Sequence, residues 1–149
     1  IIMNKLITIL VSTIIFVGTA YADHHNEVIK PSQMTKSDIA GAIYERSDMT
    51  KSTTNGNTTL DVTDMLSSDG KFETGMFRSG ATKMVIDEPY GVDEIFYIIE
   101  GSITLTSADG SVLTSGAGET LSIPKEWTGI WETDGYSKIW AIYYGESKD

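Results

Sequence analysis

The stretch Asp87–Gly101, with the sequence DEPYGVDEIFYIIEG, contains the side chains of this chain that are best placed to do chemistry. Its two candidate catalytic residues are Glu88 and Glu94. If both carboxylates face one cavity, repulsion and the loss of water would keep one of them protonated, as a general acid requires. The alternative is that Glu88 lies on the rim, in water, and has no chemical role.

The same two carboxylates, together with the Tyr90 hydroxyl, offer only oxygen ligands to a metal. Oxygen ligands suit Mg²⁺, Ca²⁺ or Mn²⁺ better than zinc or copper, and this set is too small for a tight site. We therefore expect no metal and no cofactor here. A buried Glu94 would then need partners. Arg78 and Lys83 on the preceding strands are the candidate bases, and tyrosine and tryptophan donors are the alternative.

Short strands must position these residues, because the chain from Thr59 onward is a series of short apolar segments separated by turn residues. Ala108–Gly110 contains an Asp-Gly pair, which is typical of a hairpin turn. Ile95–Ile99 is a continuous apolar run, which favours a strand buried on both faces. The pattern predicts an all-β sandwich or barrel over residues 59–149.

Residues 23–58 are predicted to form an N-terminal arm that is irregular or helical. Thr35 and Asp38 have the spacing of a capping box and predict a short helix that ends by Ile43. The segment 47–59 is rich in Ser, Thr, Asn and Gly, so we expect a loop there.

Two spacings in the barrel segment resemble the motifs of the cupin family. Glu94 is followed after six residues by Gly101, and Gly118 after five residues by Pro124. A tryptophan-rich segment is similar to the branch of ureidoglycine aminohydrolase-like domains and the ethanolamine-utilisation Q protein; its residues are Pro124, Trp127, Gly129 and Trp131. The resemblance implies a single-domain jelly-roll β-barrel and a homodimer.

The resemblance breaks at the positions of the family's metal-binding histidines. Glu88 and Tyr90 stand at the two histidine positions of the first motif, and Gly129 stands at that of the second. Within this frame Gly129 and Trp131 should both face inward, since they are two residues apart, and the glycine should leave room for a ligand. The expected ligand-binding residues are Arg78, Tyr90, Glu94, Trp127, Gly129 and Trp131.

The first 22 residues have the layout of a secretory signal peptide. Lys5 precedes the apolar run Leu6–Val17, and Ala20–Ala22 supplies a small-x-small cleavage site. The run is too short for a membrane span, which needs about 20 residues. We expect cleavage after residue 22, export to the periplasm or medium, and no membrane contact afterwards.

Cleavage at that point would create a new amino terminus with the sequence Asp23-His24-His25. A terminal amine, backbone amides and a third-position histidine could bind Cu²⁺ or Ni²⁺ in a square plane. The alternative is two histidines in an unstructured tail.

The composition argues against two classes of partner and leaves three functions open. The formal net charge is −10, which repels nucleic acid and anionic membranes. The first hypothesis is a cupin that binds a small molecule without a metal. The second is an aminohydrolase-type or carboxylate-type enzyme that uses Glu88 or Glu94, and the third is an inert structural or partner-binding module.

Overall fold

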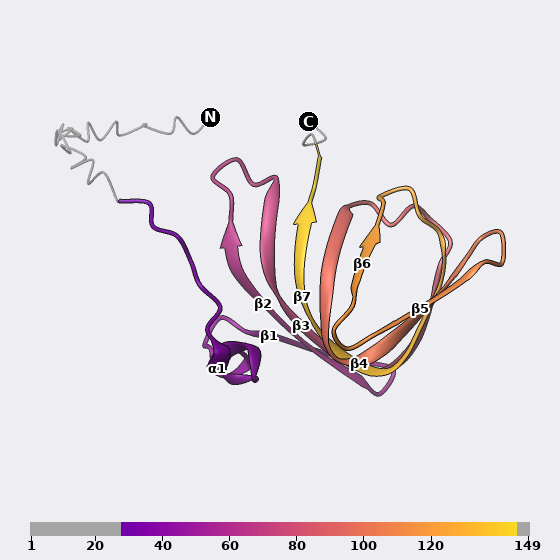
Figure 1. The fold of residues 1–149 in the computed structure, drawn as a ribbon, viewed down its shortest axis with the longest axis horizontal. Coiled ribbons are helices and arrows are strands. Elements are labelled where there is room, and N and C mark those ends of the chain that lie inside the picture. Colours follow the sequence, from indigo (N-terminus) through magenta and orange to yellow (C-terminus); the bar gives the residue numbers. More distant parts are fainter. Residues whose placement is uncertain (1–27, 146–149) are drawn as a thin grey trace, which may run out of the picture. The chain divides into compact units, whose positions relative to one another are not determined.

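Seven antiparallel strands form one curled sheet in the computed structural model, which describes residues 28–145 (Figure 1). The strands are β1 (Thr50–Thr54), β2 (Asn57–Leu66), β3 (Phe72–Ile86), β4 (Asp93–Ser107), β5 (Val112–Gly116), β6 (Thr120–Ile123) and β7 (Gly129–Tyr143). Their order is β1-β2-β3-β7-β4-β5, and β6 pairs with β4. The prediction of an all-β jelly-roll barrel is confirmed.

Two of the sequence-based predictions fall outside the described residues. The signal peptide, residues 1–22, and the copper or nickel site at Asp23, His24 and His25 therefore stay predictions. Within residues 28–145, no helix has the length and apolar character that a membrane crossing requires.

The predicted helix is present but is divided in two. The Thr35 hydroxyl accepts from the Asp38 amide, and the Asp38 carboxylate accepts from the Thr35 amide, which completes the capping box at the start of α1 (Lys36–Ile39). Gly41 has a φ of 122°, which ends α1, and a 3-10 helix, η1 (Ala42–Glu45), follows. The glycine inside the apolar pattern is what breaks the helix.

The loop expected over residues 47–59 is wrong, because this segment forms the β1–β2 hairpin. Asn55 and Gly56 make the turn with φ values of 51° and 80°, and this Asn-Gly pair is a strong hairpin signal. The Thr53 and Thr58 hydroxyls lie 3.0 Å apart across the hairpin. A polar strand was missed because periodicity is visible only when one face is apolar.

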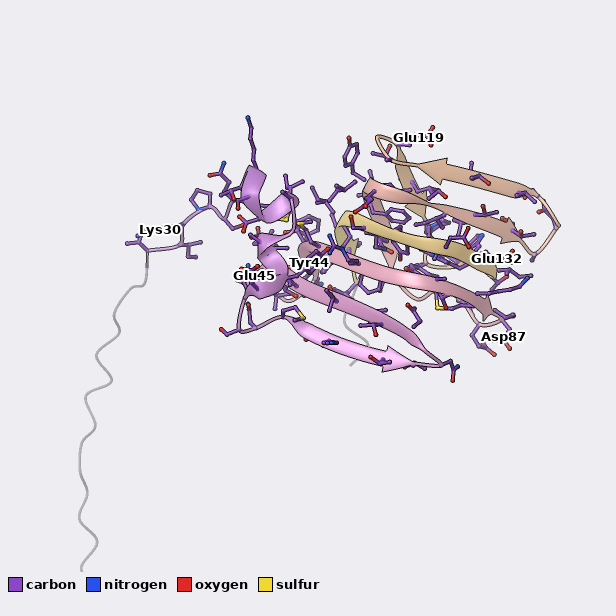
Figure 2. The ribbon with its side chains drawn as sticks, turned by 90° about the horizontal axis from the view of Figure 1, so that it is seen from below. Lys30, Tyr44, Glu45, Asp87, Glu119 and Glu132 are labelled. Carbon is purple, nitrogen blue, oxygen red and sulfur yellow. The ribbon has the colours of Figure 1, made fainter. Side chains whose placement is uncertain are left out.

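Two separate apolar clusters lie on opposite faces of the sheet. The inner core comprises Phe96, Ile98, Ile103, Leu105, Leu121, Ile123, Trp131, Tyr136 and Trp140. The outer core comprises Ile43, Tyr44, Val62 and Met76. Figure 2 shows Tyr44 between the helical segment and the strands, so this segment covers the outer face of β2 and β3.

Strand β4 is fully buried on its inner face but largely exposed on its outer face, which corrects the expectation for Ile95–Ile99. Phe96 and Ile98 are 2% and 0% exposed, whereas Ile95 and Tyr97 are 52% and 44% exposed. The sequence run is apolar on both faces, but on the outer face only Ile99 packs against a cluster, while Ile95 and Tyr97 are exposed. Glu94 shares the inner face with Phe96 and Ile98, as the two-residue period requires.

Strand β7 lies between β3 and β4 and brings together side chains from distant parts of the sequence. Lys138 stands in register with Phe77 on β3 and with Ile98 on β4. Alternation along β7 then turns Lys138 toward the inner face, while the neighbouring Ile139 packs on the outer core. This arrangement places a lysine in the middle of the barrel.

Candidate functional site

A cavity of about 280 Å³ lies on the inner face of the sheet. Its walls come from β2, β3, β4 and β7, from Tyr90 just before β4, and from Tyr144 just after β7. The lining residues are Asp61, Glu73, Phe77, Met84, Tyr90, Glu94, Trp131, Tyr136, Lys138, Trp140, Ile142 and Tyr144. The wall is therefore mainly aromatic, with four charged side chains.

The Glu94 carboxylate on the cavity wall is held from two sides. Lys138 Nζ lies 2.5 Å from Glu94 Oε1, and the Tyr90 hydroxyl donates to Glu94 Oε2 over 2.6 Å. Glu94 and Lys138 are only 4% and 5% exposed. A buried charge is tolerated when it is paired and hydrogen-bonded, and here both carboxylate oxygens are engaged.

Four aromatic rings surround the Lys138 ammonium. Nζ lies 4.2 Å from the Phe96 ring centroid, 5.3 Å from Trp131, 5.7 Å from Phe77 and 6.0 Å from Tyr136. Burial lowers the pKa of Lys138, and the Glu94 carboxylate offsets part of that fall. The negative ring faces stabilise the ammonium where water cannot.

Tyr90 and Trp131 form a stacked pair beside this ion pair. Their ring centroids are 6.4 Å apart with planes inclined by 13°, and Trp127 packs edge-on against Tyr90. The Trp127 indole donates to the Ser107 hydroxyl over 3.1 Å, whereas Trp131 Nε1 is buried and has no partner among the described residues. Burial, with the nearby Glu94 charge, raises the pKa of Tyr90, so its hydroxyl stays a donor.

Two further carboxylates, Asp61 and Glu73, line the cavity. Glu73 accepts a hydrogen bond of 2.5 Å from the Thr63 hydroxyl and another from the Tyr144 hydroxyl. Asp61 Oδ1 is buried and unpaired within residues 28–145. Burial raises the pKa of Asp61, and hydrogen bonding from Trp140 offsets part of that rise.

The structure brings together three of the predicted ligand-binding residues. Tyr90, Glu94 and Trp131 line the cavity, and Trp127 supports Tyr90 from behind. Glu88 is exposed and does not line the cavity. The pairing of Glu88 with Glu94 across a shared cavity, on which acid–base catalysis depended, is therefore absent.

The tyrosine donor expected for Glu94 is present as Tyr90, but neither of the two predicted bases contacts Glu94. The Arg78 guanidinium lies 4.8 Å from the centre of the Tyr44 ring, at the outer core, and Arg78 does not line the cavity. Lys83 pairs with Glu132 at 2.8 Å. Adjacency in sequence suggested these bases, but β7 inserts between β3 and β4 and supplies Lys138 instead.

Gly129 does not open space for a ligand, contrary to the sequence-based expectation. A Cβ atom at this position would lie 2.2 Å from the Thr106 carbonyl oxygen and 2.8 Å from a Trp127 ring carbon. The glycine is needed because β7 and β4 approach closely there. Any larger side chain would strain the strand pair whether or not the cavity binds a ligand.

The residues of this site do not fit the metal that the cupin family motif implies. Both Glu94 oxygens already accept hydrogen bonds, from Tyr90 and Lys138. The two histidines of the chain are at positions 24 and 25, and there is no cysteine. Among residues 28–145, no three His, Cys, Asp or Glu side chains come together as a metal site.

Sequence reasoning missed Lys138, Tyr136 and Asp61 as cavity residues. A signal for two of them was present, because Tyr136, Lys138, Trp140 and Ile142 alternate along one strand face and all line the cavity. A lysine within an otherwise aromatic and aliphatic face needs a buried anion. Asp61 lies in a mixed polar strand, where no such contrast exists.

Comparison with known proteins places this fold. A family model described as the EutQ-like cupin domain matches residues 66–138. No curated protein sequence matches the chain.

Solved structures agree on the fold. A protein of unknown function from Pseudomonas syringae superposes with a TM-score of 0.58 at 18% identity, over 63% of this chain and 43% of that protein. EutQ from Clostridium difficile gives 0.52 at 22% identity, over 67% and 79% of the two chains. Ectoine synthase from P. lautus gives 0.55 at 15% identity, over 68% and 72%. The chain thus spans less than half of the Pseudomonas protein, and these identities speak for the fold alone.

Proposed function

The chain belongs to the cupin family, with a EutQ-like cupin domain over residues 66–138, and we propose that it binds a small polar organic molecule in a barrel that works without a metal. The observation that carries this proposal is the Glu94–Lys138 pair on the cavity wall. The ammonium supplies the positive charge next to Glu94 that a metal would otherwise supply. The charged groups on the cavity wall are thus held in place by the chain's own residues, without a metal.

The size and lining of the cavity support binding over an inert barrel. Ligand sites are concave, mostly apolar and equipped with a few convergent polar groups, and this cavity of about 280 Å³ has all three features. Its volume is near the lower limit of ligand sites, about 300 Å³, so the ligand is small. An enzyme that uses Glu88 is not supported, because Glu88 is exposed.

Blocking the mouth of the cavity tests this proposal. Met84 lines the cavity and stands opposite Trp131 in register, while the adjacent Val85 is 69% exposed and does not line it. Thermal shift against a library of small metabolites should find ligands that bind the parent chain and the Val85→Trp variant. The same ligands should lose binding in Met84→Trp.

Two results would contradict the proposal. One is a library in which no compound stabilises the chain and native mass spectrometry finds no bound small molecule. The other is a ligand that binds Met84→Trp as well as it binds Val85→Trp, since its site would then lie elsewhere.

We also propose that the protein is exported after cleavage at residue 22 and that it forms a homodimer. The charged start, apolar run and Ala20–Ala22 support the first statement, and the family resemblance supports the second. An intact mass that begins at Asp23 checks the cleavage. Native mass spectrometry of the same sample checks the dimer.

A further inference from the structure

The cavity contains two buried polar atoms of opposite kind that have no hydrogen-bond partner among residues 28–145. One is the donor Nε1 of Trp131, and the other is the acceptor Oδ1 of Asp61. Trp131 is only 2% exposed, so bulk water does not satisfy its indole. Because buried polar groups in native proteins are nearly always paired, both atoms indicate where a ligand would bind.

The formal charge of the lining favours a positively charged ligand. Asp61, Glu73 and Glu94 contribute three negative charges and Lys138 one positive charge, which leaves −2. The low-dielectric walls strengthen this field compared with an exposed cluster of the same charges.

Asp61 is the carboxylate best able to accept a new hydrogen bond. Glu94 already accepts from Lys138 and Tyr90, and Glu73 accepts from Thr63 and Tyr144. The Oδ1 oxygen of Asp61 has no hydrogen-bond partner among residues 28–145. A cationic donor at Oδ1 would supply the hydrogen bond that this buried oxygen lacks among residues 28–145.

Aromatic side chains near Asp61 suit the same kind of group. Trp140 lowers the pKa of Asp61 and so offsets part of the rise that burial causes, and both Trp140 and Tyr144 line the cavity. Aromatic faces attract ammonium groups, most strongly where water is excluded.

The Trp131 indole favours a neutral acceptor at the other position. Lys138 lies 5.3 Å from the Trp131 ring, but Glu94 neutralises it at 2.5 Å, so the pair offers no net positive charge at this end. A ligand carboxylate would be buried there without a counter-ion of its own, whereas a carbonyl or hydroxyl oxygen could accept the indole N–H at a smaller desolvation cost.

We propose that the cavity binds a compact organic cation that also carries a neutral hydrogen-bond acceptor. Its ammonium group contacts Asp61 and its acceptor contacts Trp131 Nε1. This assignment rests on the proposed function and narrows it to a chemical class. Linear amino amides have both groups and can be varied in length to match the separation of the two contacts.

Calorimetric titration of the full mature chain with three matched probe series tests this class. The series are linear amino amides from glycinamide to aminohexanamide, alkylamines without the amide, and alkanamides without the amine. One amino amide length should bind at least about tenfold more tightly than its matched amine and its matched amide, because each of these lacks one hydrogen bond.

Two variants assign the contacts. Asp61→Asn should remove most of the preference for the amino amide over the alkanamide, and Trp131→Phe should remove the preference over the alkylamine. Glu132→Gln, on the exposed part of β7, should change neither. Asp61→Asn is nearly isosteric, so it keeps the test decisive if Trp131→Phe fails to fold.

The outcomes separate this inference from the proposed function. Equal affinity for amino amides and alkanamides, or a preference that survives in Asp61→Asn, overturns the ligand class. If no probe binds while the library yields a ligand that Met84→Trp excludes, the class is wrong and the binding function stands. If the probes bind Met84→Trp unchanged, both are wrong.

Discussion

Two lysine–glutamate pairs of this barrel have similar geometry and very different surroundings. Lys138 and Glu94 lie 2.5 Å apart with side chains 7% and 2% exposed, whereas Lys83 and Glu132 lie 2.8 Å apart with side chains 61% and 41% exposed. Figure 2 labels Glu132 at the surface of the sheet. Contact distance alone would rank the two pairs as equals.

The difference shows that burial, more than contact, decides what an ion pair does. An exposed pair gains about 0–1 kcal/mol, because water already solvates both charges. Within the barrel, the Lys138 and Glu94 side chains are 7% and 2% exposed, so each depends on the other and on Tyr90 more than on bulk water. The buried pair is therefore a weak net stabiliser, although the loss of one partner alone is costly, and it sets the charge pattern of the cavity wall.

The largest effect is expected from Lys138→Met, which keeps the volume but leaves Glu94 buried without its cation. Breaking a buried pair in this way costs about 3–5 kcal/mol. Urea unfolding followed by circular dichroism measures the loss. The double variant Glu94→Leu with Lys138→Met should recover most of it, because no charge is then stranded.

A Lys138→Met variant that unfolds within about 1 kcal/mol of the parent would contradict the comparison. It would mean that water reaches Glu94 through the cavity and solvates the carboxylate, as at the surface.

Glu94→Gln should cost about 1.5–3 kcal/mol, the value of a hydrogen bond to a charged group. The amide keeps the shape of the side chain but no longer neutralises Lys138. Thermal unfolding measures the change, and Glu132→Gln is the matched control at the exposed pair. Equal shifts in the two variants would argue against a role for burial.

Tyr90→Phe should cost about 1.5 kcal/mol, since it removes one donor from the Glu94 carboxylate and leaves Lys138 in place. Tyr97→Phe is the control, because Tyr97 is 44% exposed on the outer face. The free energy of unfolding should fall more in Tyr90→Phe than in Tyr97→Phe. Equal values would show that the Tyr90 hydroxyl does not support the pair.

The pH dependence of stability should carry the signature of the buried lysine. The pKa of Lys138 is lower in the folded protein than its ordinary value of 10.5, so the unfolded chain binds more protons between these two pKa values. The stability contributed by Lys138 should therefore rise with pH up to about 10.5. Above pH 10 the raised pKa of Tyr44, about 12 because of burial, acts in the opposite direction.

Unfolding free energies of the parent and of the Glu94→Leu, Lys138→Met double variant, compared at several pH values, isolate the lysine contribution. Below pH 10, Tyr44 and Tyr90, whose ordinary pKa of 10.0 is raised by folding, stay largely protonated in the folded and the unfolded chain, so the difference there reports the lysine. A difference that is flat or falls from pH 8 to about 10 would rule out a depressed lysine pKa.

The smallest effect is expected from Lys83→Met, with a cost below about 1 kcal/mol that shrinks further in salt. Both charges of this pair are solvated when separated. Unfolding at low and high ionic strength measures it, while Lys138→Met should respond little to salt. A large salt-insensitive loss in Lys83→Met would remove the distinction between the two pairs.

Much of the fold could be predicted from local sequence, but the ion pair could not. The two-residue period predicts that Glu94 shares a face with Phe96 and Ile98, and the resemblance to the cupin motif, carried by the spacing of Glu94 to Gly101, implies that this face points inward. Its partner Lys138 is 44 residues away and is brought close because β7 lies between β3 and β4. Strand order is set by the packing of the whole barrel and has no local signature.

The errors at Gly129 and in Ile95–Ile99 have a common physical cause. Each side chain was interpreted from its own type, without the layer that lies opposite. The main chain at Thr106 fills the space beside Gly129, and solvent lies over Ile95 and Tyr97. Burial depends on tertiary neighbours. The two-residue alternation of a strand therefore predicts which side chains share a face, but not which part of the protein covers that face.

Strand β1 forms one edge of the sheet, and its sequence bears on how this protein behaves at high concentration. An edge strand offers unpaired backbone groups that can template the addition of another chain. The sequence of β1 is Thr-Lys-Ser-Thr-Thr, and each of its residues is exposed. A charged Lys51 in a strand without apolar side chains makes edge-to-edge stacking unfavourable, so amyloid-like growth should not begin at this edge.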